Sequence, residues 1–152
     1  MKGFGEIYRS QKKNNDKSKL SKNQIINQAF HFHQQGNISE AAKYYKLFLD
    51  RGFSDERVFS NYGAILYGLG NLKEAESHAR KAIEINPNFS DAYSNLGIIL
   101  NDLGDLKEAE FSYRKAIEIN PNFAMAHSNL GTVLRDLGNL KEAEFSYRKA
   151  IE

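Results

Sequence analysis

A repeat of 34 residues constrains the fold of this chain more than any other feature. Residues 90–123 match residues 56–89 at 22 of 34 positions, and they match residues 124–152 at 22 of 29 positions. The only two prolines, Pro87 and Pro121, are also 34 residues apart. Self-similarity at a fixed period of this length indicates an array of stacked units, each of which buries its apolar surface against its neighbours.

Each repeat contains two apolar patterns with helical spacing, one over residues 90–103 and one over residues 106–119. Gly104 stands between them, where a helix commonly ends in a left-handed residue. Asp105 follows as a predicted N-cap, with Glu108 three residues later. Asn71 and Asn139 repeat that position. The pattern therefore predicts an antiparallel helical hairpin in every repeat.

Three glycines occupy the same position inside the predicted first helices: Gly63, Gly97 and Gly131. Glycine in a helix interior costs roughly 1 kcal/mol relative to alanine. We expect this cost to be offset by a close approach of the second helix, which would leave no room for a Cβ atom.

The repeat resembles the tetratricopeptide repeat, whose signature is a large residue, Leu-Gly and a second large residue, then Ala, an aromatic residue and Pro. The resemblance covers about residues 22–152, and the style of the repeats is similar to arrays of O-linked N-acetylglucosamine transferases and of long bacterial repeat proteins. It implies an all-α solenoid of antiparallel helical hairpins wound as a right-handed superhelix. The matching residues in one repeat are Tyr93, Leu96, Gly97, Leu100, Ala109, Tyr113 and Pro121.

The chain divides into a tail and an array. Residues 1–20 are basic and lack an apolar period over residues 9–19, which predicts a disordered tail. Residues 21–152 form the array: a degenerate repeat over residues 22–55, regular repeats over 56–89 and 90–123, and an incomplete repeat over 124–152. A capping box is predicted at Ser21 and Gln24. Because the last repeat stops inside its second helix, we expect an exposed apolar edge there.

Composition narrows the classes of function. The chain has no cysteine, which excludes disulfides and thiolate zinc sites and favours a reducing compartment such as the cytoplasm. The net charge is +2, but residues 1–21 hold six basic and two acidic side chains, so the array itself is not basic. The array therefore gives no electrostatic argument for binding nucleic acid. No apolar run is long enough to cross a membrane.

The residues do not predict an enzyme. No phosphate-binding loop, zinc-protease helix or nucleophile elbow is present. His31 and His33 are two residues apart on a helix and so lie on different faces, and His78 and His127 have no evident partners. We predict neither a catalytic site nor a cofactor nor a metal site.

A varied polar face on the first helices is the candidate binding surface. Positions on this face change from repeat to repeat, whereas Leu106–Glu118 is identical to Leu140–Glu152 in the second helices. The resemblance implies that the first helices line a concave groove for extended peptides, and that an asparagine ladder grips the ligand backbone. An alternative is that the asparagines are repeat consensus with local bonds. The candidate peptide-binding residues are Asn27, Asn61, Asn95, Asn129, Ser60, Ser94, Ser128, Tyr67, Asn101 and Arg135.

The sequence thus predicts a non-catalytic protein-interaction module that binds a protein or peptide ligand. The alternative is a substrate-targeting part of a larger glycosyltransferase or sulfotransferase. Self-association through the end of the array is compatible with either. The family's two-carboxylate clamp needs lysines where this chain has serine and other residues, so that type of ligand is not expected.

Overall fold

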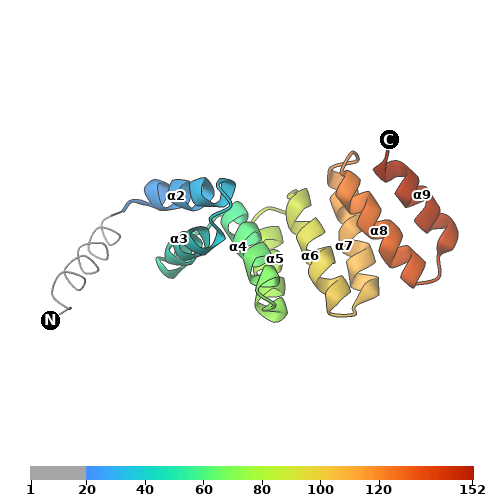
Figure 1. Cartoon of the computed structure of the whole chain (residues 1–152), viewed down its shortest axis with the longest axis horizontal. Helices are drawn as coiled ribbons and strands as arrows, with labels where there is room; N and C mark the ends of the chain where they lie inside the picture. The colour runs from blue at the N-terminus through green and yellow to red at the C-terminus, as the bar shows by residue number, and fades with distance from the viewer. Residues whose placement is uncertain (1–19) are drawn as a thin grey trace. The chain divides into compact units, whose positions relative to one another are not determined.

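The computed structural model describes residues 20–152, and these residues are helical hairpins joined by short turns (Figure 1). They fall into two compact units that divide between Phe53 and Ser54. The described part of the first unit contains α2 (Lys22–Gln34) and α3 (Ile38–Asp50). The second unit contains six helices: α4 (Glu56–Gly68), α5 (Leu72–Ile85), α6 (Ser90–Asp102), α7 (Leu106–Ile119), α8 (Ala124–Asp136) and α9 (Leu140–Ala150).

The predicted helix ends are largely confirmed. The Ser21 side chain accepts from the Gln24 N–H, and the Gln24 side chain accepts from the Ser21 N–H, which completes the capping box. Gly104 has a φ of +84°, and the Asp105 side chain accepts from the Glu108 N–H at 3.3 Å. The prediction was wrong for the caps at Asn71 and Asn139, which occupy the N-cap position with similar backbone angles but make no side-chain cap bond.

The two helices of the first unit pack through aromatic side chains. Tyr45 and Phe48 of α3 are fully buried, together with Ile25 and Ala29 of α2. The Tyr45 hydroxyl lies 2.8 Å from Nδ1 of His33. This contact shows that His33 is a packing residue of the hairpin. The predicted tail covers residues 1–20, and all of it except Leu20 lies outside the described residues.

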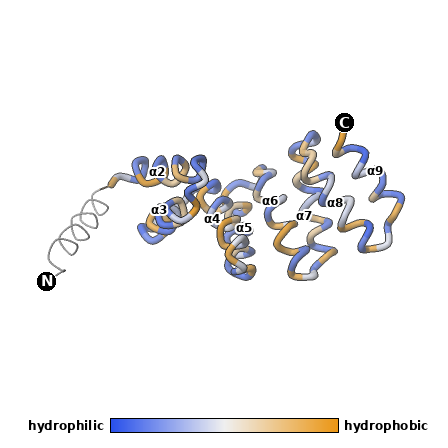
Figure 2. The backbone as a smooth tube through the Cα atoms, viewed as in Figure 1, coloured by the Kyte–Doolittle hydropathy of each residue, from blue (hydrophilic) through white to orange (hydrophobic). Residues whose placement is uncertain are grey.

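The second unit has one continuous apolar core, which runs through all its hairpins. Each helix carries an apolar stripe and a polar one, so both colours alternate along every helix in Figure 2. Alanines at the hairpin interfaces are fully buried, among them Ala75, Ala109 and Ala116. Each hairpin therefore completes its core only with the help of the next one.

The helical glycines allow the close approach that the sequence predicted. A Cβ atom built on Gly97 would lie 2.7 Å from the Tyr113 ring, and one on Gly131 would lie 2.8 Å from the Tyr147 ring. Gly63 differs, because Ala79 stands where the other repeats have tyrosine; its nearest neighbour is Cβ of His78, at 3.2 Å. The second helices thus press an aromatic ring against the first helices in two of the three repeats.

The first helices of this unit lie closer together than the second helices. α6 contacts both α4 and α8, whereas no comparable contact joins α7 to α5 or to α9. We call the surface of α4, α6 and α8 the first-helix face, and the surface of α5, α7 and α9 the second-helix face. This spacing is that of a curved stack with the first helices on its inner side, as expected for a solenoid.

Candidate functional site

The predicted asparagine ladder lies along the first-helix face. Asn61, Asn95 and Asn129 occupy equivalent turns of α4, α6 and α8, and each is half-buried. Because these three helices contact one another in series, the asparagines form one row. Asn27 is exposed on α2, in the other unit, and is considered apart from that row.

Asn95 and Asn129 have different neighbours within the protein. Nδ2 of Asn95 donates to Oγ of Ser60 on the preceding first helix at 3.0 Å. Asn129 instead lies near the hydroxyl of Tyr113 from α7, and its side chain partly offsets the rise in the pKa of that hydroxyl. The difference has a local cause, since α5 carries Ala79 where α7 carries Tyr113, and Asn95 has no phenol to bind. An amide can form further bonds beyond the one it uses here, so these contacts orient the side chains without exhausting them.

The serines beside the ladder require a correction. Ser60 and Ser94 are only 1% exposed, so they are not available to an incoming peptide, and only Ser128 is exposed. They precede the asparagines by one position, which turns them toward the next first helix and not toward solvent. Oγ of Ser94 is buried without a hydrogen-bond partner.

The varied positions lie six residues beyond the asparagines on the same three first helices. They are Tyr67, Asn101 and Arg135. The Tyr67 hydroxyl donates to Oδ2 of Asp102 at 2.7 Å and so connects α4 to α6. Arg135 is exposed and forms an ion pair with Asp136, its neighbour in sequence, at 2.9 Å. Asn101 is half-buried, and its Oδ1 atom is buried without a partner. The chemistry presented here thus changes from phenol to amide to guanidinium along the array.

Asp102 was not among the predicted site residues, although it belongs to the same polar face. Its hydrogen bond raises the pKa of the Tyr67 hydroxyl. Burial, and then the charge of Asp102, raises the pKa of the Tyr113 hydroxyl. Both phenols are therefore neutral hydrogen-bonding groups at physiological pH. The signal for Asp102 in the sequence was its recurrence as Asp136 one repeat later.

The histidines do not form a metal site. No group of three potential metal ligands comes together among residues 20–152. Nε2 of His127 lies 2.9 Å from the carbonyl oxygen of Pro121. His78 packs against the rings of Phe59 and Tyr62, and burial lowers the pKa of its imidazole. These histidines act as packing residues of the hairpins.

Taken together, the helical hairpins and the varied polar face define a solenoid protein of the interaction-module class. Tetratricopeptide repeat models match residues 56–89, 90–123 and 112–145, which together make up more than half of the chain. The chain belongs to the tetratricopeptide repeat family, whose members are typically non-catalytic interaction scaffolds. None of the curated proteins matches the sequence.

Solved structures agree with this fold. A crystal structure of MamA has a TM-score of 0.81 at 22% identity, over 94% of this chain and 84% of that chain. MamA from Desulfovibrio magneticus RS-1 (its residues 41 to the end) gives 0.77 at 18% identity, over 88% and 76%. YrrB, described as a tetratricopeptide repeat protein with an unusual peptide-binding site, gives 0.74 at 24% identity, over 86% and 68%. In residues 20–152, no helix has the length and apolarity to cross a membrane.

Proposed function

We propose that the first-helix face binds an extended peptide segment of a partner protein. The observation that carries this proposal is the row of Asn61, Asn95 and Asn129 on three first helices that contact one another. The bond from Asn95 to Ser60 holds one of these amides in place. A side chain that is already oriented loses less conformational freedom when it binds.

The amide row suits a peptide backbone, because an amide offers donors and an acceptor whatever the ligand side chains are. Tyr67, Asn101 and Arg135 would then choose among ligand sequences, since they differ from repeat to repeat at one position. The MamA and YrrB structures support the fold, and the peptide-binding site described for YrrB supports the class of ligand. Ser128 is the one candidate serine whose exposure suits a role in binding.

The test is a peptide-library selection followed by titration calorimetry with the triple variant N61A/N95A/N129A. Each lost hydrogen bond contributes roughly 0.5–1.5 kcal/mol, so we expect about a tenfold or larger loss of affinity. A matched control is K73A/K107A/K141A, which changes one exposed lysine in each second helix and should leave affinity unchanged. If the asparagine variant stays folded and binds the selected peptides with parental affinity, the ladder is not the site.

Three further proposals follow from the sequence. In the second candidate function, this module is the substrate-targeting part of a larger glycosyltransferase or sulfotransferase. Sequencing the gene on both sides of these residues tests that proposal. A cytoplasmic location in a bacterium is proposed from the lack of cysteine and the style of the repeats. Self-association through the end of the array is supported by exposed apolar side chains there: Leu140 and Phe145 of α9, and Ile151 just after it, which is 86% exposed.

A further inference from the structure

Two equivalent pockets lie on the second-helix face, one repeat apart. The pocket between α5 and α7 has a volume of about 330 Å³, and the pocket between α7 and α9 has a volume of about 450 Å³. They exist because the second helices do not pack against one another as the first helices do. Eight lining residues of the first pocket have their repeat equivalents in the second, among them Ile83 and Ile117, Leu96 and Leu130, and Phe111 and Phe145.

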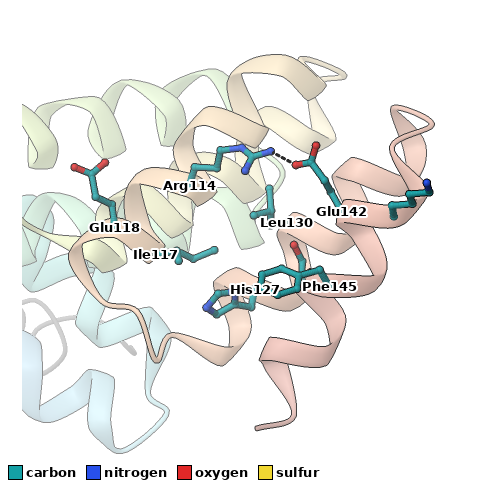
Figure 3. A pocket seen from close by; sticks show the side chains of 9 residues that line it. Arg114, Ile117, Glu118, His127, Leu130, Glu142 and Phe145 are labelled. Atoms are coloured by element: carbon teal, nitrogen blue, oxygen red, sulfur yellow. Dashed lines mark hydrogen bonds and ion pairs between the residues drawn. The ribbon is translucent and has the colours of Figure 1, made fainter.

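Both pockets are lined by apolar and charged side chains, and Figure 3 shows the one between α7 and α9. In the second pocket, Ile117 and Leu130 line the floor, and Phe145 forms a wall. Arg114 of α7 spans the rim to Glu142 of α9 at 2.7 Å, as Arg80 spans the rim of the first pocket to Glu108. The apolar lining and the ion pairs that both pockets share favour a large apolar side chain that enters between the paired charges.

The side chains that match this description are themselves part of the pocket walls on this face. Phe111 is 56% exposed and Phe145 is 59% exposed. These are large aromatic side chains, and half or more of each is left in water. Because the pockets and the phenylalanines are both related by the same repeat, the two pockets and the two rings have the same spacing.

We propose that the second-helix face binds the same face of a second copy of this chain, related by a two-fold axis. In an antiparallel pairing, Phe111 of one copy enters the pocket between α7 and α9 of the other. The equal spacing then places Phe145 of the first copy at the pocket between α5 and α7. The two-fold axis repeats both contacts, so one arrangement fills all four pockets with four rings.

The charges of this face are compatible with a copy of itself. α5 and α7 each hold three basic and three acidic side chains, and α9 holds three basic and two acidic ones, so the face carries both signs and a net charge of only +1. A strongly basic or acidic partner finds no complementary field here, whereas two nearly neutral surfaces of mixed charge do not strongly repel each other. This is why the second copy is favoured over a charged peptide as the occupant. The proposal is independent of peptide binding on the first-helix face.

Another repeat of the array shows which substitution of these phenylalanines the fold accepts. Ser77 of α5 occupies the position of Phe111 and Phe145, so F111S/F145S reproduces a residue that this repeat already carries there. Sedimentation equilibrium of the full chain over a range of concentrations should show a dimer for the parent. Each phenylalanine is used twice in the dimer, so F111S/F145S should raise the dissociation constant by about a hundredfold or more, judged from the apolar area withdrawn. Helicity should be retained.

Two further measurements identify the surface. Hydrogen exchange should slow with concentration in peptides from α7 and α9, and it should not change in α4 or α6. The matched control is I151S, which removes the most exposed apolar side chain of the last hairpin without touching either pocket. Dimerisation that survives F111S/F145S, or that is lost with I151S, overturns the proposal. A chain that stays monomeric at about 1 mM, a concentration at which an interaction of only about 4 kcal/mol would be seen, also overturns it.

Discussion

Replacing Gly97 with alanine should destabilise the second unit, although alanine is the better helix former. The new Cβ atom would lie 2.7–2.9 Å from three atoms of the Tyr113 ring. That ring is only 2% exposed, so it has no free space into which to move. Overpacking of this kind costs about 1–3 kcal/mol, and we take the upper end because three ring atoms are involved. The gain in helix propensity of about 1 kcal/mol leaves a net loss of about 2 kcal/mol.

The double variant G97A/Y113A isolates this cause. α5 already carries alanine at the position of Tyr113, so Y113A introduces a residue that the repeat accommodates, at a cost of about 3 kcal/mol or more. In the Y113A background, the added methyl group has no ring to meet. G97A should then stabilise the protein by up to about 1 kcal/mol, which gives a coupling energy of about 3 kcal/mol between the two sites.

Urea unfolding followed by far-ultraviolet circular dichroism measures all four proteins of this cycle. Gly68→Ala is the matched control, because Gly68 also lies in a first helix but has no atom within 4 Å of the added Cβ. It should be neutral or stabilising by up to about 1 kcal/mol. If Y113A proves too unstable to measure, G131A/Y147A offers the same geometry at a half-buried tyrosine. The reasoning is refuted if G97A is as stable as the parent, or if its cost persists in the absence of Tyr113.

Two more predictions concern the first-helix face and the aromatic cluster of the repeat over residues 56–89. In thermal unfolding, S60A should destabilise by about 1 kcal/mol, because it removes the acceptor of Asn95. S94A should be neutral or stabilising because that buried hydroxyl lacks a partner, and S128A should be neutral because Ser128 is exposed. Equal effects of all three would show that these contacts do not decide stability. Burial lowers the pKa of His78, so the unfolded chain binds more protons below about pH 6.5 and the parent should lose stability as the pH falls from 7 toward 5. H78S, which restores the serine of the other repeats, should weaken this dependence, and an identical pH profile for both proteins would contradict the assignment.

The fold could be predicted because the sequence pattern repeats with a fixed period. The 34-residue repeat, the glycines at 97 and 131 and the caps at Ser21 and Asp105 each specify local geometry, and the structure agrees with them. A repeat array also makes neighbouring contacts predictable, because each hairpin meets a near copy of itself. The membership in the tetratricopeptide repeat family was visible for the same reason.

The candidate site was less accessible to sequence reasoning, since it depends on which way equivalent side chains turn. Ser60 and Ser94 share a polar character with the exposed Ser128, and only the packing of consecutive first helices separates them. The different surroundings of Asn95 and Asn129 depend on the residue at position 79 or 113 of another helix. The pockets of the second-helix face require the spacing between hairpins, which no single repeat contains.

The unequal spacing of the helices also makes the second unit mechanically asymmetric. Along α4, α6 and α8 the direct packing of side chains resists both compression and extension, so this row behaves as a stiff backbone. Across α5, α7 and α9 the pockets are crossed by exposed ion pairs, Arg80 to Glu108 and Arg114 to Glu142, which salt weakens and which yield at low force. The stack therefore bends most easily by opening or closing the gaps between the second helices, while the spacing of the first helices changes little. Anything that fills those pockets stiffens it.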